Sequence, residues 1–385
     1  MTDDLLLDVR NLTVSFGTSR RRPAPVVDGV SFSIAAGECL ALVGESGSGK
    51  SVTARTLIGL AGPDARVTAD RLQLRGHDLA SQTERQWRRV RGRQIGFVLQ
   101  DALVSLDPLR TVGREIDDSL RLHTTLTRSQ RRPRVLQLLD DVGIPDPELR
   151  AGQRAGELSG GMRQRALIAA AIALEPELII ADEPTTALDV SIQSQILDVL
   201  AGLAERGTAV LMISHDLSVV RNIADRVAVM RRGEIVESGP TLEILERPRH
   251  EYTKALIRAV PSAHPRGQRL TTGERVAAPR PVSADLGAEP VLELAGVTKR
   301  FGTGAHASFT AVDDVSITVH AGRTLGLVGA SGSGKTTTAR IALGLTSPDA
   351  GSVRLLDAPW VPLPEAQRRK RRSLIGAIYQ DPFSS

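Results

Sequence analysis

Cysteine, aromatic residues and long apolar runs are all scarce in this 385-residue sequence. Cys39 is its one cysteine, which excludes an internal disulfide and any metal cluster built on cysteines. The longest apolar run, ALIAAAIAL at 166–174, is about half of the roughly 20 residues that a membrane-spanning helix needs. The beginning, MTDDLLLDVR, does not resemble a secretory signal. We therefore expect a cytoplasmic protein.

Lysine is also rare, with five residues against 44 arginines, and the formal net charge is +5. The arginines gather in runs such as RRVRGR (88–93), RRPR (131–134) and RRKRR (368–372). Such runs can attract phosphate backbones, but no aromatic residues are interleaved in them to stack on bases. We interpret them as solvated faces of an arginine-rich protein and expect no nucleic-acid partner.

A long internal repeat is present. The segment VVDGVSFSIAAGECLALVG (26–44) aligns without a gap on AVDDVSITVHAGRTLGLVG (311–329), at an offset of 285 residues. A repeat of this length is a duplicated domain rather than a solenoid unit. Residues 261–290 are rich in Pro, Ala and Arg and have no hydrophobic period, which is typical of a linker. We predict a first domain at 5–260, this linker, and a second domain at 291–385.

The first copy alternates short apolar strands with helical patterns. CLALV (39–43), ELIIAD (177–182) and TAVLMIS (208–214) are strand-like, and a helical pattern follows each of them. Apolar strands that alternate with helices indicate a parallel sheet covered on both faces. The fold class predicted is α/β.

Both copies carry a glycine-rich loop of the form G-x-x-x-x-G-K-S/T, GESGSGKS at 44–51 and GASGSGKT at 329–336. Glycines let successive backbone N–H groups turn toward phosphate oxygens, and the start of the following helix adds its positive dipole. Lys50 or Lys335 supplies a charge for the β- and γ-phosphates, and the hydroxyl that follows can bind Mg²⁺. The loops predict nucleotide binding together with Mg²⁺.

Two carboxylates end a buried strand in LIIADEPT (178–185). Asp182 can hold Mg²⁺ through water, and Glu183 can polarise a water for attack on the γ-phosphate. Because Pro184 would stop a strand by itself, the motif alone could be a simple turn. Its position after a phosphate loop favours metal-assisted hydrolysis.

The stretch LSGGMRQR (158–165) opens a helix with Ser159, Gly160 and Gly161. The free N–H groups and the serine hydroxyl there form a second anion site. An ordinary helix cap does not need two glycines after the serine, so we expect something to approach this backbone closely.

These motifs, followed by ALD and SHD, resemble ATP-binding-cassette (ABC) ATPases in order and spacing. The resemblance covers residues 5 to 260 fully and 291 to 385 in part. QDALVSLDPL (100–109) and RPRHEYTKAL (247–256) resemble the branch that energises peptide and nickel importers. The implied fold is a P-loop NTPase core with an antiparallel β subdomain and a helical subdomain, followed by a partial second copy.

The resemblance also implies roles for single residues. Phe16 and Phe301 match the aromatic that stacks on adenine, although either could simply belong to the core. Gln100 and Gln380 match the glutamine that contacts Mg²⁺ and the attacking water. Asp189 matches the aspartate at the seam between two domains.

His215 matches the histidine that grips the γ-phosphate, so the catalytic residues implied are Glu183, His215 and Gln100. The Mg²⁺ ligands implied are Ser51, Gln100, Asp182, Thr336 and Gln380. The nucleotide-binding residues are Phe16, Gly44, Ser46, Gly47, Gly49, Lys50, Ser51, Ser159, Gly160, Gly161, Asp189, Phe301, Gly329, Ser331, Gly332, Gly334, Lys335, Thr336 and Gln380.

Two departures from the branch limit what is carried over. Glu251 stands where the branch usually has proline. The cysteines that build an iron–sulfur site in some relatives are absent, so we expect no such cluster.

Family members hydrolyse ATP between two such domains, with the phosphate loop of one facing the LSGG of the other. The resemblance implies an ATP-hydrolysing subunit of an importer for di- or oligopeptides or a similar small solute. Its implied partners are integral-membrane permease subunits, a second ABC ATPase domain and, indirectly, an extracellular solute-binding protein. The implied location is the cytoplasmic face of the cell membrane.

The second copy reaches Ser385, shortly after Gln380, without a second LSGG, acidic pair or switch histidine. We expect a truncated second domain that is not catalytic. Two alternatives stay open: a cassette ATPase of translation or DNA repair, and an inactive product. The first would bring long charged linkers, zinc modules or coiled coils, which the sequence does not show.

Overall fold

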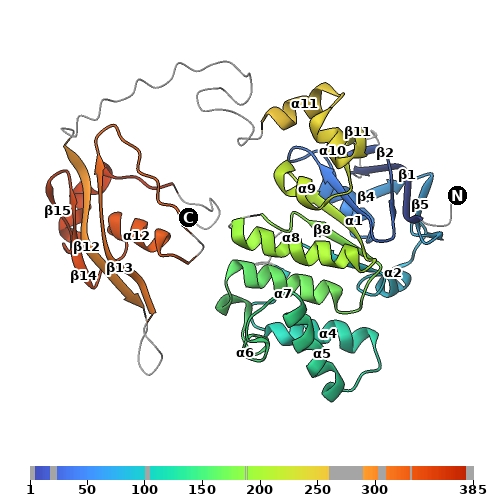
Figure 1. Ribbon diagram of the computed structural model, residues 1–385, viewed down its shortest axis with the longest axis horizontal. Coiled ribbons are helices and arrows are strands. Elements are labelled where there is room, and N and C mark those ends of the chain that lie inside the picture. Colours follow the sequence, from blue (N-terminus) through green and yellow to red (C-terminus); the bar gives the residue numbers. More distant parts are fainter. Residues whose placement is uncertain are drawn as a thin grey trace. The chain divides into compact units, whose positions relative to one another are not determined.

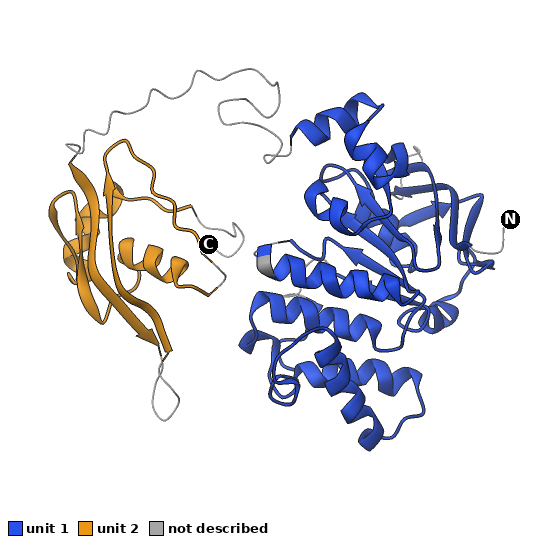
Figure 2. Ribbon diagram, viewed as in Figure 1, with its two compact units in different colours: residues 1–277 blue, residues 278–385 orange. Residues whose placement is uncertain are grey.

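The structure is a computed structural model of residues 1–385. The residues that it describes are 5–17, 24–99, 105–186, 188, 190–259, 289–301, 309–329 and 332–378. The chain divides into two compact units, residues 1–277 and residues 278–385 (Figure 2). Most of the predicted linker at 261–290 lies outside the described residues.

The first unit begins with an antiparallel sheet. Its strands are β1 (Leu5–Phe16), β2 (Val27–Ala35), β4 (Ala65–Thr68), β5 (Arg71–Leu74) and β6 (His77–Asp78). The order is β2-β1-β5-β6, and β4 also pairs with β1. Inward residues of β1 alternate with exposed ones, because one face is buried and the other meets solvent.

A six-stranded sheet forms the centre of this unit, in the order β11-β10-β3-β9-β8-β7. The strands are β3 (Cys39–Val43), β7 (Ile95–Val98), β8 (Leu178–Asp182), β9 (Ala209–Ser214), β10 (Arg226–Arg231) and β11 (Glu234–Pro240). All pairs are parallel except β10 with β11. Every residue of β3, β8 and β9 is buried, which explains their continuous apolar sequences.

Alternate residues of the central strands face different hydrophobic clusters. Leu40 and Leu42 of β3 join the cluster that contains the antiparallel sheet and α1 (Lys50–Thr56). Cys39 and Val43 join a cluster with α9 (Leu217–Ile223), α10 (Thr241–Glu246) and α11 (Glu251–Arg258). The parallel sheet is therefore covered on both faces, as predicted.

A group of helices lies on the β7–β8 side of the sheet. It consists of α4 (Val112–His123), α5 (Arg128–Asp141), α6 (Pro147–Ala151), η1 (Ala155–Glu157), α7 (Gly160–Ile172) and α8 (Val190–Glu205). Figure 1 shows α7 beside α8, with α4, α5 and α6 beyond α7. The short α2 (Glu84–Val90) packs its Trp87 into the cluster of the antiparallel sheet. The predicted helical and antiparallel β subdomains are both present.

The second unit is a four-stranded antiparallel sheet with one helix packed on it. Its strands, in the order β13-β12-β14-β15, are β12 (Pro290–Phe301), β13 (Phe309–His320), β14 (Ala350–Leu355) and β15 (Ala358–Val361). The helices are α12 (Lys335–Ala342), α13 (Glu365–Arg368) and η3 (Arg369–Leu374). Trp360 is fully buried at the centre of its core.

One segment of the second unit differs from its counterpart. Residues 323–329 align with β3 but form no strand, and Leu325, Leu327 and Val328 are exposed. β3 is paired on its two sides by β9 and β10, which come from residues 209–231. Among the described residues of the second unit, no strand pairs with this segment. An apolar sequence of this kind becomes a strand only between neighbours that complete its hydrogen bonds.

Two of the basic runs are not simply solvated, so that interpretation was partly wrong. Arg368 is buried and donates to Gly344 O at 2.5 Å. Arg91 donates from Nε to Ile58 O at 2.8 Å. These guanidinium groups bind carbonyls just after α12 and α1, where helix ends leave acceptors without partners.

Candidate functional site

The first phosphate loop joins the end of β3 to the start of α1. Gly44 and Gly49 have φ values of 151° and 102°, which favour glycine. A Cβ on Gly44 would lie 2.2 Å from Met230 O, and one on Gly49 would lie 2.8 Å from Val26 O. These glycines are therefore required by the backbone that surrounds the loop as well as by its curvature.

Lys50 is buried in the loop that it follows. Its Nζ donates to Gly44 O at 2.7 Å and to Glu45 O at 2.9 Å. Burial lowers the pKa of this ammonium group, although the carboxylates of Glu183, Asp182 and Glu45 favour its charged form. The lysine is therefore held against the backbone of its own loop by two carbonyl oxygens.

Asp182 ends β8 beside this loop. The Ser51 hydroxyl donates to Asp182 Oδ1 at 2.9 Å, and Oδ2 is buried without a hydrogen-bond partner. Burial raises the pKa of this carboxyl group, because the charged form is poorly solvated there. A hydroxyl and an unpartnered carboxylate oxygen side by side are a donor set that fits Mg²⁺.

No group of three or more His, Cys, Asp or Glu side chains suited to a metal occurs among the described residues. Mg²⁺ at Ser51 and Asp182 would therefore take its remaining ligands from phosphate oxygens and water, which is its usual preference.

Glu183 and His215 lie next to each other at the ends of β8 and β9. His215 Nδ1 is 3.4 Å from Glu183 Oε1, and the Thr186 hydroxyl donates to Glu183 Oε2 at 3.0 Å. Glu183 has a φ of 49°, and its amide donates to Ile213 O at 3.0 Å. Glu183 thus adopts an unusual backbone conformation directly after β8, and His215 is more than half exposed beside its carboxylate.

The LSGG segment begins α7, and Ser159 is its N-cap, accepting from Met162 N at 3.3 Å. A Cβ on Gly161 would lie 2.4 Å from Ile192 Cγ2, so the close approach expected at this position comes from α8. At Gly160 the nearest heavy atom to a Cβ would be 3.6 Å away. Packing against α8 explains why residue 161 is a glycine. The same packing does not explain Gly160, where a Cβ would meet no atom closer than 3.6 Å.

The two predicted adenine-stacking aromatics differ in their surroundings. Phe16 ends β1 half-buried and packs against the hydrophobic cluster of the antiparallel sheet. Phe301 is 47% exposed, and Lys299 Nζ lies 5.6 Å from its ring centroid. The Phe301 ring is therefore nearly half exposed to solvent, whereas part of the Phe16 ring packs in the hydrophobic core.

The second loop has the same local form as the first. Gly329, Gly332 and Gly334 have φ values of 156°, 81° and 88°, and Lys335 Nζ donates to Gly329 O at 2.7 Å. Thr336 is exposed at the start of α12. In the first loop, Ser46 and Gly47 are also exposed. Four predicted residues, Gln100, Asp189, Ser331 and Gln380, lie outside the described residues.

One contact to the first loop was not predicted. Tyr252 Oη of α11 accepts a hydrogen bond from Glu45 N at 3.0 Å. In the sequence, the segment around Tyr252 served only as a marker of the family branch. The two residues are 207 positions apart, so no local pattern could have joined them.

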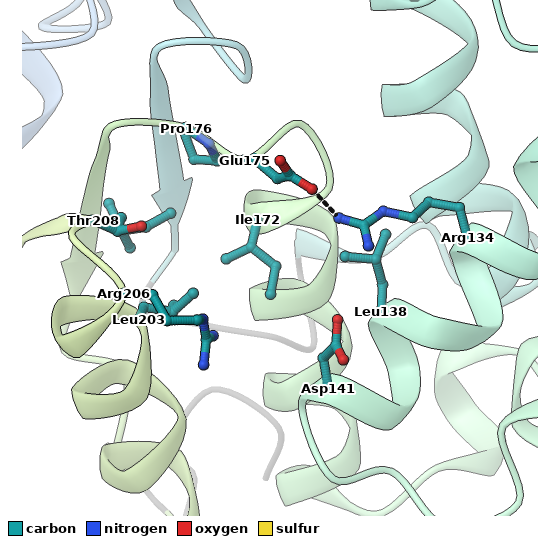
Figure 3. A pocket seen from close by; sticks show the side chains of 10 residues that line it. Arg134, Leu138, Asp141, Ile172, Glu175, Pro176, Leu203, Arg206 and Thr208 are labelled. Carbon is teal, nitrogen blue, oxygen red and sulfur yellow. Dashed lines mark hydrogen bonds and ion pairs between the residues drawn. The ribbon is translucent and has the colours of Figure 1, made fainter.

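A cavity of about 500 Å³ lies between α5, α7 and the end of α8 (Figure 3). Arg134 and Glu175 pair at its rim at 2.6 Å. Ile179, near the start of β8, lines it, whereas Asp182 is the last residue of that strand. The cavity is at the amino-terminal end of the parallel strands, and ligands of such sheets bind at the carboxyl end. We do not assign the nucleotide to it.

None of the helices in the described ranges is both long and apolar enough to cross a membrane.

Comparisons with known proteins agree with this arrangement. The family described as ABC transporter matches residues 27–186 and 312–385. The family described as the oligopeptide/dipeptide transporter C-terminal region matches residues 236–284.

Curated relatives cover nearly the whole chain. The peptidoglycan transport ATP-binding protein YejF of Agrobacterium fabrum is 39% identical over 387 residues, which are 99% of this chain and 68% of that protein. The glutathione import ATP-binding protein GsiA of Shigella flexneri is 40% identical over 405 residues, covering 99% of this chain and 64% of that protein. This chain thus spans about two thirds of the length of these relatives.

Solved structures resemble the chain as well. The dimeric ATP-binding cassette MJ0796 bound to ADP and Pi is 27% identical, with a TM-score of 0.54, over 61% of this chain and 98% of that one. The structure of cbiO1 from Clostridium perfringens, part of the ABC transporter complex cbiONQ, is 25% identical, with a TM-score of 0.55, over 63% of this chain and 92% of that one. The expected fold is confirmed, and the chain belongs to the ABC transporter ATPase family, in its oligopeptide, dipeptide and glutathione import branch.

Proposed function

We propose that this chain binds and hydrolyses ATP and thereby energises an importer of peptides or a similar small solute. The observation that carries the proposal is the convergence of Lys50, Asp182 and Glu183 at the carboxyl ends of β3 and β8. The names of the relatives, which are transport and import ATP-binding proteins, support the same conclusion.

The chemistry follows from the position of each side chain. Lys50 would leave its two carbonyls and bind the β- and γ-phosphates. Ser51 and Asp182 would hold Mg²⁺, which supplies charge neutralisation at those phosphates when bound. Glu183 would orient the attacking water and accept its proton, because its carboxylate follows Asp182 directly at the carboxyl end of β8 and lies beside His215.

His215 would also contact the γ-phosphate, since its Nδ1 lies 3.4 Å from Glu183 Oε1 and thus beside the same site. Gln100, two positions after the last residue of β7 in the sequence, is proposed as the residue that joins the nucleotide to a membrane partner.

The site is proposed to be completed by a second ABC ATPase domain, whose LSGG segment would cover the phosphates. Ser159 and Gly160 of this chain would serve a partner domain in the same way, because Ser159 is exposed and no atom lies closer than 3.6 Å to a Cβ placed on Gly160. The proposed partners in the membrane are permease subunits fed by an extracellular solute-binding protein. The chain would then act at the cytoplasmic face of the cell membrane.

Glu183→Gln tests the proposed chemistry. The amide keeps the shape of the side chain but cannot accept a proton, so ATP should still bind while turnover falls by about 10² to 10⁴-fold. The measurement is phosphate release at saturating MgATP, with nucleotide affinity measured in parallel.

Glu177→Gln is the matched control, because Glu177 precedes the other end of β8 and pairs with Arg75. Its turnover should equal that of the unaltered chain. Hydrolysis by the Glu183→Gln chain at the unaltered rate would remove Glu183 from this role.

A further inference from the structure

Tyr252 connects the C-terminal part of the first unit to the phosphate loop. It lies on α11, within the stretch 236–284 that matches the oligopeptide/dipeptide transporter C-terminal region. Its side chain is buried, and Oη accepts a hydrogen bond from Glu45 N at 3.0 Å. Glu45 is the second residue of the loop 44–51, so α11 is bonded directly to the loop that we propose binds phosphate.

The peptide groups of Glu45 are held from two directions. Its N–H donates to Tyr252, and its carbonyl accepts from Lys50 Nζ at 2.9 Å. The second bond breaks when the lysine turns toward a phosphate, whereas the first does not involve any group that must move. Tyr252 therefore holds the Glu45 amide independently of Lys50, and Ser48 N donates to the Glu45 carbonyl oxygen at 3.2 Å.

The tyrosine ring is itself fixed by its neighbours. The Arg231 guanidinium at the end of β10 lies 4.9 Å from the ring centroid. Tyr252 N donates to His250 Nδ1 at 3.1 Å, which caps α11. Glu237 of β11 accepts from the amides of Arg249 at 2.7 Å and His250 at 3.1 Å. The start of α11 is thus bound to the same sheet that carries the loop.

Packing alone does not require the hydroxyl. A phenyl ring would fill the same space, yet the hydroxyl supplies the partner of a loop amide. Burial raises the pKa of Tyr252, against the opposing effect of the Glu45 amide, so the group stays neutral at physiological pH and keeps its lone pair available.

We propose that Tyr252 is a positioning residue that holds Glu45, and with it the first phosphate loop, in the conformation that receives the β- and γ-phosphates. This role rests on the proposed nucleotide binding at Lys50. It makes α11 a determinant of nucleotide affinity, in addition to its place in the hydrophobic cluster.

Tyr252→Phe tests the proposal in the full chain, because it removes the hydroxyl and keeps the ring. Both Tyr252→Phe and its control are made in a chain that also carries Lys335→Ala, so that nucleotide binding is measured at the first loop alone. Titration with MgADP, and with MgATP in the presence of Glu183→Gln, should show dissociation constants about three- to tenfold higher, since one loop hydrogen bond is lost. Lys254→Gln is the matched control: Lys254 is on the same helix and pairs with Glu251 at 2.7 Å, away from the loop, and should leave both constants unchanged.

Thermal unfolding without nucleotide separates positioning from simple stability. A lowered unfolding midpoint with unchanged dissociation constants would mean a structural role only and would overturn the proposal. Failure of the chain that carries only Lys335→Ala to bind nucleotide would be a different result, because it would refute the proposed function itself and this role with it.

Hydrogen exchange of the Glu45 amide in the unaltered chain decides the matter if Tyr252→Phe does not fold. Glu45 is an exposed residue, so its amide should be protected only through Tyr252. We expect slowed exchange of this amide relative to the exposed Gly47 amide. Free exchange of the Glu45 amide would overturn the proposal.

Discussion

The two phosphate loops of this chain have nearly the same backbone but very different surroundings. Gly44 and Gly329 have φ values of 151° and 156°, and in each loop the lysine Nζ is 2.7 Å from the first glycine's carbonyl oxygen. The loop conformation is therefore encoded locally, by glycines and by a lysine that closes the turn on itself.

The surroundings of the loops are not local. β3 leads into the first loop between β9 and β10, and all of its residues are buried. Residues 324–328 lead into the second loop as an exposed segment that belongs to no strand. Lys50 is buried beside two carboxylates, whereas Lys335 is only half-buried and no acidic pair follows it in this sequence. A phosphate loop can form without its sheet, but a catalytic site needs the strands that bring Asp182 and Glu183 to it.

A second device recurs in both units. Arg91 Nε donates to Ile58 O at 2.8 Å, and Arg372 Nη1 donates to Leu343 O at 3.0 Å. Each arginine binds a carbonyl just after the helix that follows the phosphate loop. In the second unit the antiparallel sheet and α12 share one hydrophobic cluster, whereas in the first unit the cluster of the antiparallel sheet and α1 also contains residues of β3, β8 and β9.

Thiol labelling gives the largest expected contrast between the copies. Cys39 begins β3, and burial, with the nearby Asp225 and Glu38 carboxylates, raises its pKa to about 12. Thr324 is its exposed counterpart at the offset of 285 residues. A thiol introduced as Thr324→Cys should keep an ordinary pKa of about 8.5 and react about 10³-fold faster or more at neutral pH, since the thiolate is the reactive form.

The unaltered chain, which has only Cys39, is the control and should label only when denaturant unfolds it. Slow labelling of the Thr324→Cys chain would mean that position 324 is buried in a strand as Cys39 is. The contrast between the two copies would then fail.

The LSGG segment of the first copy gives the next effect. Gly161→Ala places a Cβ 2.4 Å from Ile192 and should lower the free energy of unfolding by about 1–3 kcal/mol. Gly160→Ala meets no atom closer than 3.6 Å and should be nearly neutral. Denaturant unfolding of the first unit measures both, and equal costs would contradict the packing described at α7.

The smallest expected effect is a change in stability at Glu237, whose carboxylate accepts hydrogen bonds from the Arg249 and His250 amides at the start of α11. Desolvation alone would raise its pKa, but the hydrogen bonds that it accepts, which include those from the Arg249 and His250 amides, lower it. A lowered pKa means that the stabilisation is present above the unfolded value, about 4.3, and is lost as pH falls through the folded value.

Glu237→Gln should therefore reduce the free energy of unfolding by about 1 kcal/mol at pH 7. The difference should vanish at acidic pH, where the carboxyl group of the unaltered chain is protonated. A difference that persisted unchanged below pH 4 would exclude this charge as its cause.

Much of the fold could be predicted because the relevant signals are local. Continuous apolar runs predict buried parallel strands, and β8 and β9 lie where ELIIAD and TAVLMIS indicate them. The loops and the acidic pair could be predicted for the same reason. The lack of a strand at residues 324–328 could not be predicted, because a strand depends on partners that the segment itself does not specify.

Contacts between residues that are distant in the sequence could not be predicted either. Gly161 faces Ile192 of α8, and Tyr252 bonds a loop 207 residues away, and neither follows from spacing. Arg368 was expected in solvent, but its guanidinium is buried against backbone carbonyls that only the folded unit brings together.

Nucleotide titration of the full chain tests most directly whether the surroundings, rather than the loop, make the site. The variants are Lys50→Ala and Lys335→Ala, which remove equivalent ammonium groups from loops of the same form. Lys50→Ala should weaken MgADP binding about 10- to 100-fold, as expected for hydrogen bonds to a charged group in a buried site, and Lys335→Ala should leave it unchanged. Equal losses in the two variants, or a loss only with Lys335→Ala, would contradict the account.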